Sequence, residues 1–250
     1  MTDTAITMTG LGHAYRSGCW VFRHYDADFA KGRITALLGS NGRGKTTLLR
    51  LLLGVLRPTE GTVRLNGRAA FVPQLFQVGF DYSVLDMVVM GRARHIGMLS
   101  QPSARDEATA LTALDRFGLA DQAYRPFHEL SGGQRQLVIF ARALVSEADI
   151  LILDEPTSAL DLKNQMLVLE RIERLARDEG LTVLFTTHHP QHALEIADDA
   201  LLMMDETRFA SGAASDVLSD ENLEALYGVT LKRVTFDHGG HRKETIASIR

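Results

Sequence analysis

The stretch of sequence that decides the fold reads Gly39-Ser40-Asn41-Gly42-Arg43-Gly44-Lys45-Thr46, followed by Thr47. It matches the pattern G-x-x-x-x-G-K-[ST] of a phosphate-binding loop. The largely apolar run Ile34–Leu38 before it predicts a buried strand, and Thr46–Leu53 behind it predicts a helix. A strand, a glycine-rich loop and a helix in this order predict a P-loop nucleotide-binding core.

Each part of this loop predicts a contact with the phosphates of a nucleotide. Glycines allow successive backbone N–H groups to point inward around a phosphate, and the positive end of the following helix adds to the attraction. We expect Lys45 to reach the β- and γ-phosphates and the Thr46 hydroxyl to ligate Mg²⁺. Arg43 has two open interpretations, a further phosphate contact or a side chain that points to solvent.

An apolar run that ends in two acids is the second informative stretch. Ile150–Leu153 predicts a strand buried on both faces, and Asp154 and Glu155 follow at its carboxyl end, where α/β sheets bind their ligands. We expect Asp154 to hold Mg²⁺ and Glu155 to act as general base for water at the terminal phosphate. Two acids can also simply cap a strand. The catalytic interpretation of this pair therefore depends on the phosphate loop elsewhere in the same chain.

The third motif is the pentapeptide Leu130-Ser131-Gly132-Gly133-Gln134, which opens a predicted helix. Ser131 is a good N-cap, and an ordinary capped helix start is one interpretation. However, two glycines are costly in a first helical turn, and they leave backbone N–H groups bare for an anion. Since one phosphate loop already serves the phosphates, this helix start is expected to complete the site of another copy of the chain.

Taken together, Lys45, Asp154, Glu155 and the Leu130–Gln134 pentapeptide resemble the ATP-binding cassette (ABC) ATPases. The resemblance covers nearly the whole chain. It implies an α/β fold: a P-loop NTPase core with a mostly parallel sheet and flanking helices, an antiparallel β edge and a helical insertion subdomain. It also implies that the chain binds and hydrolyses ATP with Mg²⁺.

The resemblance assigns roles to further residues. Tyr15 lies where these proteins stack an aromatic ring on adenine, and Gln74 resembles the glutamine that touches Mg²⁺ or the attacking water. The segment Ser158-Ala159-Leu160-Asp161 resembles the one that contacts the opposite monomer. His188 resembles the switch histidine that bonds the γ-phosphate and orients Glu155.

The histidines carry a second interpretation. His189 stands where an acid is usual in the family, so it is an adjacent candidate for the role of His188. With His192 the pair suggests a metal site, which we disfavour because the resemblance already accounts for these residues. His238 and His241 are expected to belong to a polar tail rather than to a zinc site.

Composition limits the partners. The 250 residues include 31 acids and 27 bases, a net charge of −4, so a general affinity for nucleic acid is not expected. The single cysteine, Cys19, excludes an internal disulfide and fits a reducing compartment. The start, Met1–Thr4, lacks the features of a signal peptide, and no run approaches the ~20 apolar residues that span a bilayer.

The expected organisation is a single ABC ATPase domain over 1–235, with a helical subdomain at about 81–146, and a polar C-terminal tail over 236–250. Asn66-Gly67 predicts a β-hairpin between Thr62–Leu65 and Ala69–Val72. Leu201–Met203 is expected to be the last core strand, and Asp216–Tyr227 a closing helical segment.

The resemblance also implies partners. Two cassettes stack head to tail, with ATP between Lys45 of one copy and Ser131-Gly132-Gly133 of the other. The pair then drives transmembrane permease subunits, and indirectly serves a periplasmic binding protein, from the cytoplasmic face of the inner (plasma) membrane.

Three stretches resemble the importers of metal chelates, namely Ser83–Arg92, Arg135–Val138 and Glu221–Val229. The cargo classes left open are iron-siderophore, haem, cobalamin and molybdate or tungstate. An exporter cassette and a non-transport ABC ATPase remain as alternatives.

Overall fold

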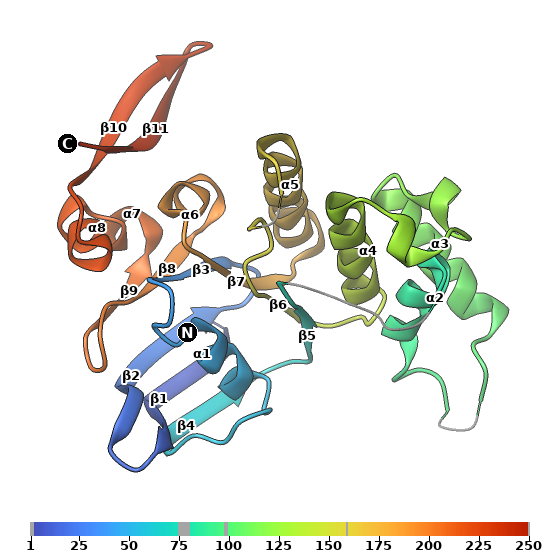
Figure 1. The fold of residues 1–250 in the computed structure, drawn as a ribbon, viewed down its shortest axis with the longest axis horizontal. Helices are drawn as coiled ribbons and strands as arrows, with labels where there is room; N and C mark the ends of the chain where they lie inside the picture. The colour runs from blue at the N-terminus through green and yellow to red at the C-terminus, as the bar shows by residue number, and fades with distance from the viewer. Residues whose placement is uncertain (1–2, 75–80, 98–99, 159, 250) are drawn as a thin grey trace.

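The computed structural model describes residues 3–74, 81–97, 100–158 and 160–249 (Figure 1). Its helices and strands, in chain order, are β1 (Thr4–Arg16), β2 (Cys19–Ala30), β3 (Ile34–Gly39), α1 (Lys45–Leu52), β4 (Glu60–Leu65), β5 (Ala69–Val72), α2 (Val84–Val89), η1 (Met90–Arg92), α3 (Ala104–Arg116), η2 (Ala120–Gln122), η3 (Phe127–Glu129), α4 (Gly132–Leu144), β6 (Ile150–Leu153), α5 (Leu162–Glu179), β7 (Thr182–Thr187), α6 (Pro190–Ile196), β8 (Asp199–Met203), β9 (Phe209–Ala213), α7 (Ala214–Val217), α8 (Asp220–Tyr227), β10 (Leu231–His238) and β11 (His241–Ser248).

The central sheet has six strands in the order β5-β6-β7-β3-β8-β9. All its pairs are parallel except β8 with β9, which is antiparallel. Every residue of β3, β6 and β7 is buried, because helices and the second sheet cover the two faces. The predicted mostly parallel α/β core is confirmed. Leu201–Met203 of β8 are buried, as expected of the last core strand, and β9 adds a more exposed antiparallel edge beyond it.

A second, antiparallel sheet has the order β2-β1-β4. Helix α1 packs between the two sheets: its Leu48 and Leu49 share one buried cluster with Phe22 of β2 and Leu37 of β3. The burial of apolar side chains in this cluster is the main stabilising contribution at this edge. The predicted antiparallel β edge is therefore confirmed, and it supports the helix that follows the phosphate loop.

The hairpin predicted at Asn66-Gly67 is wrong, because the two strands belong to different sheets. Asn66 is held against β1 by two hydrogen bonds of 2.8 Å, one donated to Ala5 O and one to Thr4 O. Arg68 instead donates its backbone N–H to the Asp149 carboxylate at 2.7 Å, just before β6. These bonds pull the two sides of the turn apart, so the turn carries the chain from one sheet to the other.

Between β5 and β6 the described chain is helical apart from short connections, and it forms a lobe to the right of the sheets in Figure 1. Helices α2, α3 and α4 bury apolar side chains in a cluster that continues into the central sheet. Buried Arg92 donates to Asp106 at 3.1 Å and to Val145 O at 3.2 Å, which ties η1 to α3 and to the end of α4. No helix of the described ranges is both long and apolar enough to cross a bilayer.

The C-terminal region differs from the predicted polar tail over 236–250. Strands β10 and β11 form an antiparallel hairpin, which projects from the body beyond α8 in Figure 1. Gly239 and Gly240 have φ of 59° and 79°, values that suit the two-residue turn of a hairpin. An ion pair of 2.6 Å between Arg233 and Glu244 crosses the strands. The polar composition of this stretch predicted a tail, and the glycine pair was not recognised as a hairpin turn.

Candidate functional site

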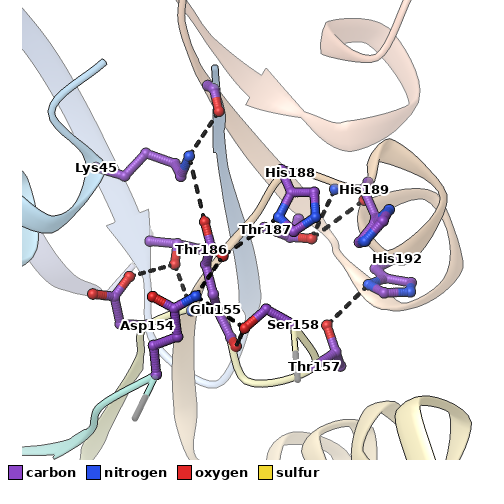
Figure 2. A network of polar contacts seen from close by, with 12 residues as sticks. Lys45, Asp154, Glu155, Thr157, Ser158, Thr186, Thr187, His188, His189 and His192 are labelled. Atoms are coloured by element: carbon purple, nitrogen blue, oxygen red, sulfur yellow. Dashed lines mark hydrogen bonds and ion pairs between the residues drawn. The ribbon is translucent and has the colours of Figure 1, made fainter. Parts of the chain in front are cut away.

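The phosphate loop lies between β3 and α1, and Lys45 is the first residue of the helix. Its side chain is buried, and its Nζ donates to Gly39 O at 2.8 Å. Gly44 has φ of 101°, and a Cβ there would lie 2.4 Å from Val21 Cγ1, so only glycine fits. The loop is thus packed against β2. The ammonium group of Lys45 points toward Gly39 O and toward the Glu155 carboxylate (Figure 2).

Asp154, at the end of β6, accepts hydrogen bonds on both carboxylate oxygens. Thr46 Oγ1 donates to Oδ2 at 3.0 Å, and Thr186 Oγ1 of β7 donates to Oδ1 at 2.8 Å. A buried carboxylate beside a hydroxyl is the kind of oxygen donor set that Mg²⁺ prefers, so the residues present fit this ion.

Glu155 lies at the centre of the network in Figure 2. Its Oε2 accepts a hydrogen bond from Gln74 Nε2 at 3.0 Å and lies 3.4 Å from His188 Nδ1. Its Oε1 lies 3.6 Å from Lys45 Nζ. The backbone of Glu155 has φ of 44°, and its N–H donates to Thr186 Oγ1 at 2.7 Å. Such a strained conformation in a non-glycine residue is characteristic of functional sites.

The same amide of Gln74 also donates to Ser158 Oγ at 3.0 Å. Gln74 follows β5, and Ser158 follows β6, so one amide bridges the ends of two neighbouring strands. This bridge fixes the position of the Gln74 side chain beside Glu155. Of the predicted segment 158–161, Ala159 lies outside the described residues.

The three clustered histidines have different surroundings. The ring centroids of His188 and His189 are 4.0 Å apart, and those of His189 and His192 are 4.9 Å apart. Burial lowers the pKa of His192 to about 4, and His192 Nδ1 lies 3.2 Å from Thr157 Oγ1. Burial and the neighbouring His188 also lower the pKa of His189. Across the described ranges, no three His, Cys, Asp or Glu side chains are arranged to hold a metal ion.

His192 should make the stability of the fold depend on pH. Its folded pKa of about 4 lies below the ordinary 6.5, so the unfolded chain binds more protons between these values and stability falls as the pH drops from 7.5 to 5. The wild type is expected to lose about 1–2 kcal/mol more than His192→Asn over this range, after allowance for solvent screening. Urea unfolding at both pH values measures this difference. An equal loss in the two proteins would contradict it.

The pentapeptide caps α4. Ser131 Oγ accepts from Gln134 N at 3.3 Å, and Gln134 Oε1 accepts from Ser131 N at 3.0 Å, so the two side chains form a capping box. Ser131 and Gly132 are exposed, and in Figure 1 α4 lies apart from α1. The structure therefore does not bring the pentapeptide to the phosphate loop of its own chain. Asp161 is also exposed and caps α5 by accepting from Asn164 N at 2.8 Å.

Two further predicted residues lie close to the loop. Tyr15 is 57% exposed, and its hydroxyl lies 3.0 Å from Thr47 Oγ1 of α1. Arg43 is half-buried, and its Nε is enclosed without a hydrogen-bond partner. The pKa of Asp205 is lowered mainly by hydrogen bonds from the backbone N–H groups of Arg208 and Thr207. The positive charge of Arg43 lowers this pKa further, so the Arg43 side chain acts on a neighbouring carboxylate. Arg43 thus does not simply extend into solvent.

The sequence interpretation missed two residues that organise the site. Thr186 bonds both Asp154 and the backbone of Glu155, and Tyr227 donates its hydroxyl to His188 O at 3.2 Å. A threonine near the carboxyl end of the otherwise mostly apolar β7 was the available signal for Thr186. No local pattern pointed to Tyr227, which lies 39 residues further along the chain.

A P-loop, an acidic pair at a strand end and a glycine-rich helix start on a separate lobe define a P-loop ATPase with a helical insertion. The chain belongs to the ABC transporter family, whose family model matches residues 22–158. Proteins of this ATP-binding family are ATPases, in agreement with the enzyme class expected from the motifs.

The similarity to known proteins extends over most of the chain. The chain is 45% identical over 225 residues to the molybdate import ATP-binding protein MolC of Haemophilus influenzae, covering 90% of this chain and 88% of that protein. It is 36% identical to a probable iron chelatin transport ATP-binding protein of Helicobacter pylori, covering 83% and 87%. A solved structure described as an inward-facing conformation of a metal-chelate type ABC transporter superposes with a TM-score of 0.95 at 41% identity, covering 99% and 98%.

Proposed function

We propose that this chain is the ATP-hydrolysing subunit of a binding-protein-dependent importer for a metal chelate or oxyanion, working through a separate transmembrane permease. The observation that carries the hydrolytic part is the Glu155 carboxylate held between Lys45, Gln74 and His188. The similarity to the molybdate and iron-chelate import subunits supports the cargo classes. Iron-siderophore, haem, cobalamin, molybdate and tungstate remain the candidates.

In this proposal Glu155 is the general base. Its carboxylate takes a proton from the attacking water, while Gln74 and His188 hold the oxygen that accepts the proton in a fixed orientation. Lys45 now lies between Gly39 O and Glu155, and the phosphates of ATP would replace these partners. Mg²⁺, held by Thr46, Asp154 and Gln74, would supply charge stabilisation at the phosphates.

The remaining predicted residues bind the nucleotide. In the proposal the backbone of the phosphate loop cradles the phosphates, and Tyr15 supports the adenine beside α1. The loop residues concerned are Gly39, Ser40, Asn41, Gly42, Arg43, Gly44, Lys45, Thr46 and Thr47. The exposure of the Tyr15 ring and the contact of its hydroxyl with Thr47 support a ligand on that side of the loop.

We further propose that two copies enclose the nucleotide. Gly133 lies against Asn164, since a Cβ on that glycine would be 3.2 Å from the Asn164 side chain, so the starts of α4 and α5 are neighbours. This face also exposes Leu162 and Met166, 75% and 52% accessible, next to Asp161. Exposed apolar side chains beside an uncovered helix start are typical of a surface that a partner covers. In the homodimer, Ser131–Gln134 and Asp161 complete the site on the opposite copy.

A groove on the helical lobe supports the docking of a permease. It has a volume of about 590 Å³ and lies along α2 and η1. It is lined by Tyr82, Asp86, Val89, Met90, Ala93, Ile96, Gly97, Ser100 and Pro102. A short stretch of chain joins Gln74, at Glu155, to Tyr82 in this groove. A segment of permease seated here would therefore be linked to the hydrolytic site, and the chain would be held peripherally at the cytoplasmic face of the inner membrane.

Ala93→Glu is expected to abolish co-purification with the proposed polytopic permease, by placing a charge in the groove. Ala93 is exposed, so the change does not disturb the core. Ala108→Glu, an exposed position on α3, is the matched control and should co-purify normally. Pull-down of each tagged variant from membranes of its native host measures both. A periplasmic binding protein in the same complex supports import, whereas its absence favours an exporter. Retention of the permease by Ala93→Glu would contradict the docking site.

A further inference from the structure

The loop that carries His188 is held from its far side by the C-terminal part of the chain. Tyr227, the last residue of α8, donates its hydroxyl to the backbone oxygen of His188 at 3.2 Å. Tyr227 is partly enclosed, and burial raises its pKa, so the hydroxyl keeps its proton and remains a donor. On the other side of the loop, the ring of His188 faces Glu155 at 3.4 Å. His188 thus links Glu155 to α8.

A second contact holds the helix that begins directly after this loop. Gln191 Oε1 on α6 accepts from the backbone N–H of Ile246 at 3.0 Å and from Thr245 Oγ1 at 3.1 Å. Both donors are on β11, so the hairpin is bonded to α6. Within the loop, Thr187 Oγ1 accepts from His189 N at 3.0 Å and donates to His189 O at 3.5 Å (Figure 2). Neither of these bonds involves His188, whose backbone oxygen is held by Tyr227.

The C-terminal segment is itself firmly attached, which a positioning element requires. Leu223 and Leu226 of α8 are buried in the main apolar cluster. The Arg233 backbone N–H at the start of β10 donates to Asp220 Oδ1 at 2.9 Å, and Lys232 forms an ion pair of 3.0 Å with the same carboxylate. Helix α8 and the hairpin are therefore joined to each other and to the core.

We infer that Tyr227 is a positioning residue for hydrolysis, acting through the backbone of His188, and that β11 reinforces it through Gln191. This inference rests on the proposed function, since it assumes that His188 orients Glu155. If the hydroxyl bond is removed, the loop gains freedom and the His188 ring spends less time in contact with Glu155. In the proposed function the phosphate loop and Tyr15 supply most of the contacts with ATP, whereas Tyr227 bonds the loop of His188. The main effect is therefore expected on kcat.

Tyr227→Phe in the full-length chain tests this directly, with steady-state hydrolysis of Mg-ATP. The loss of one hydrogen bond is expected to lower kcat about three- to tenfold, with KM for ATP unchanged within about twofold. Tyr124→Phe is the matched control, because Tyr124 is 79% exposed on the helical lobe. The control should hydrolyse ATP at the wild-type rate, and both variants should unfold near the wild-type temperature.

A double-mutant cycle separates positioning from general destabilisation. In a His188→Ala background, adding Tyr227→Phe should cause no further loss, since the hydroxyl acts only through His188. Single-turnover reactions with excess chain over radiolabelled ATP keep even slow rates measurable. The inference is overturned if Tyr227→Phe matches the wild type, if its effect appears in KM, or if the loss is the same with and without His188.

Gln191→Ala and Thr245→Val provide a second route if Tyr227→Phe does not fold. Both should lower kcat at constant KM in the wild-type background and have no effect in His188→Ala. Unchanged kcat in both variants would overturn the inference. Failure of the proposed function has a different signature, since the wild type would then not hydrolyse ATP or Glu155→Gln would be as active as the wild type.

Discussion

Glu155→Gln is expected to abolish ATP turnover while ATP binding is retained. The amide is nearly isosteric with the carboxylate and can still contact Gln74, but it cannot take a proton from water. General-base catalysis contributes about 10²–10⁴-fold, so kcat should fall by at least about 100-fold. Phosphate release measures turnover, and equilibrium binding of ATP without hydrolysis measures affinity. Size-exclusion chromatography with Mg-ATP should show an ATP-dependent dimer.

The matched control is Glu173→Gln, at an exposed position of α5. It makes the same chemical change away from the site and should hydrolyse ATP like the wild type. Hydrolysis at the wild-type rate by Glu155→Gln would remove Glu155 from the role of base. A loss of ATP binding in Glu155→Gln would instead indicate that the Lys45–Glu155 contact organises the loop.

Two inactive variants are expected to restore activity when mixed, because each site of the proposed dimer draws on both copies. Lys45→Ala removes the phosphate contact, and Gly132→Asp places a negative charge where the partner's phosphates would lie. Each alone should lose at least about 100-fold in kcat. Gly132→Asp should fold, since a Cβ there meets no atom within 4 Å and an acid is favourable at a helix start.

After chain exchange, half of the dimers are mixed, and each mixed dimer has one site with an intact loop and an intact pentapeptide. Activity should therefore return to roughly a quarter of the wild-type value if the two sites act independently. A mixture of Lys45→Ala with the double variant Lys45→Ala/Gly132→Asp is the control, since no intact site can form. If the first mixture gains no more than this control, the shared-site arrangement is wrong.

The fold class and the main motifs could be predicted because each is carried by contiguous residues. The phosphate loop needs only a strand, glycines and a helix start next to one another, and the run Ile150–Leu153 with its two acids is equally local. Ser131 and Gln134 form their capping box within one helical turn. Local backbone geometry and apolar periodicity determine such features, so they can be identified before any tertiary contact is known.

The errors arose where local signals competed with sheet formation. Asn66-Gly67 has the composition of a hairpin turn, yet β4 pairs with β1 and β5 pairs with β6. Pairing with strands far along the chain determined the direction of each side of the turn. Over 236–250 the error was reversed: a polar composition predicted a tail, but the chain forms a hairpin whose strands pair mainly with each other.

By itself the sequence determined that the chain carries a P-loop, an acid pair on a buried strand and a capped glycine-rich helix start. Only the tertiary structure decided which side chains meet at the acid pair. Thr46 and Asp154 are 108 residues apart and Gln74 and Glu155 are 81 apart, yet both pairs are hydrogen-bonded. The order β5-β6-β7-β3 aligns the carboxyl ends of these strands along one edge. Strand order depends on packing of the whole core, which no single stretch of sequence contains.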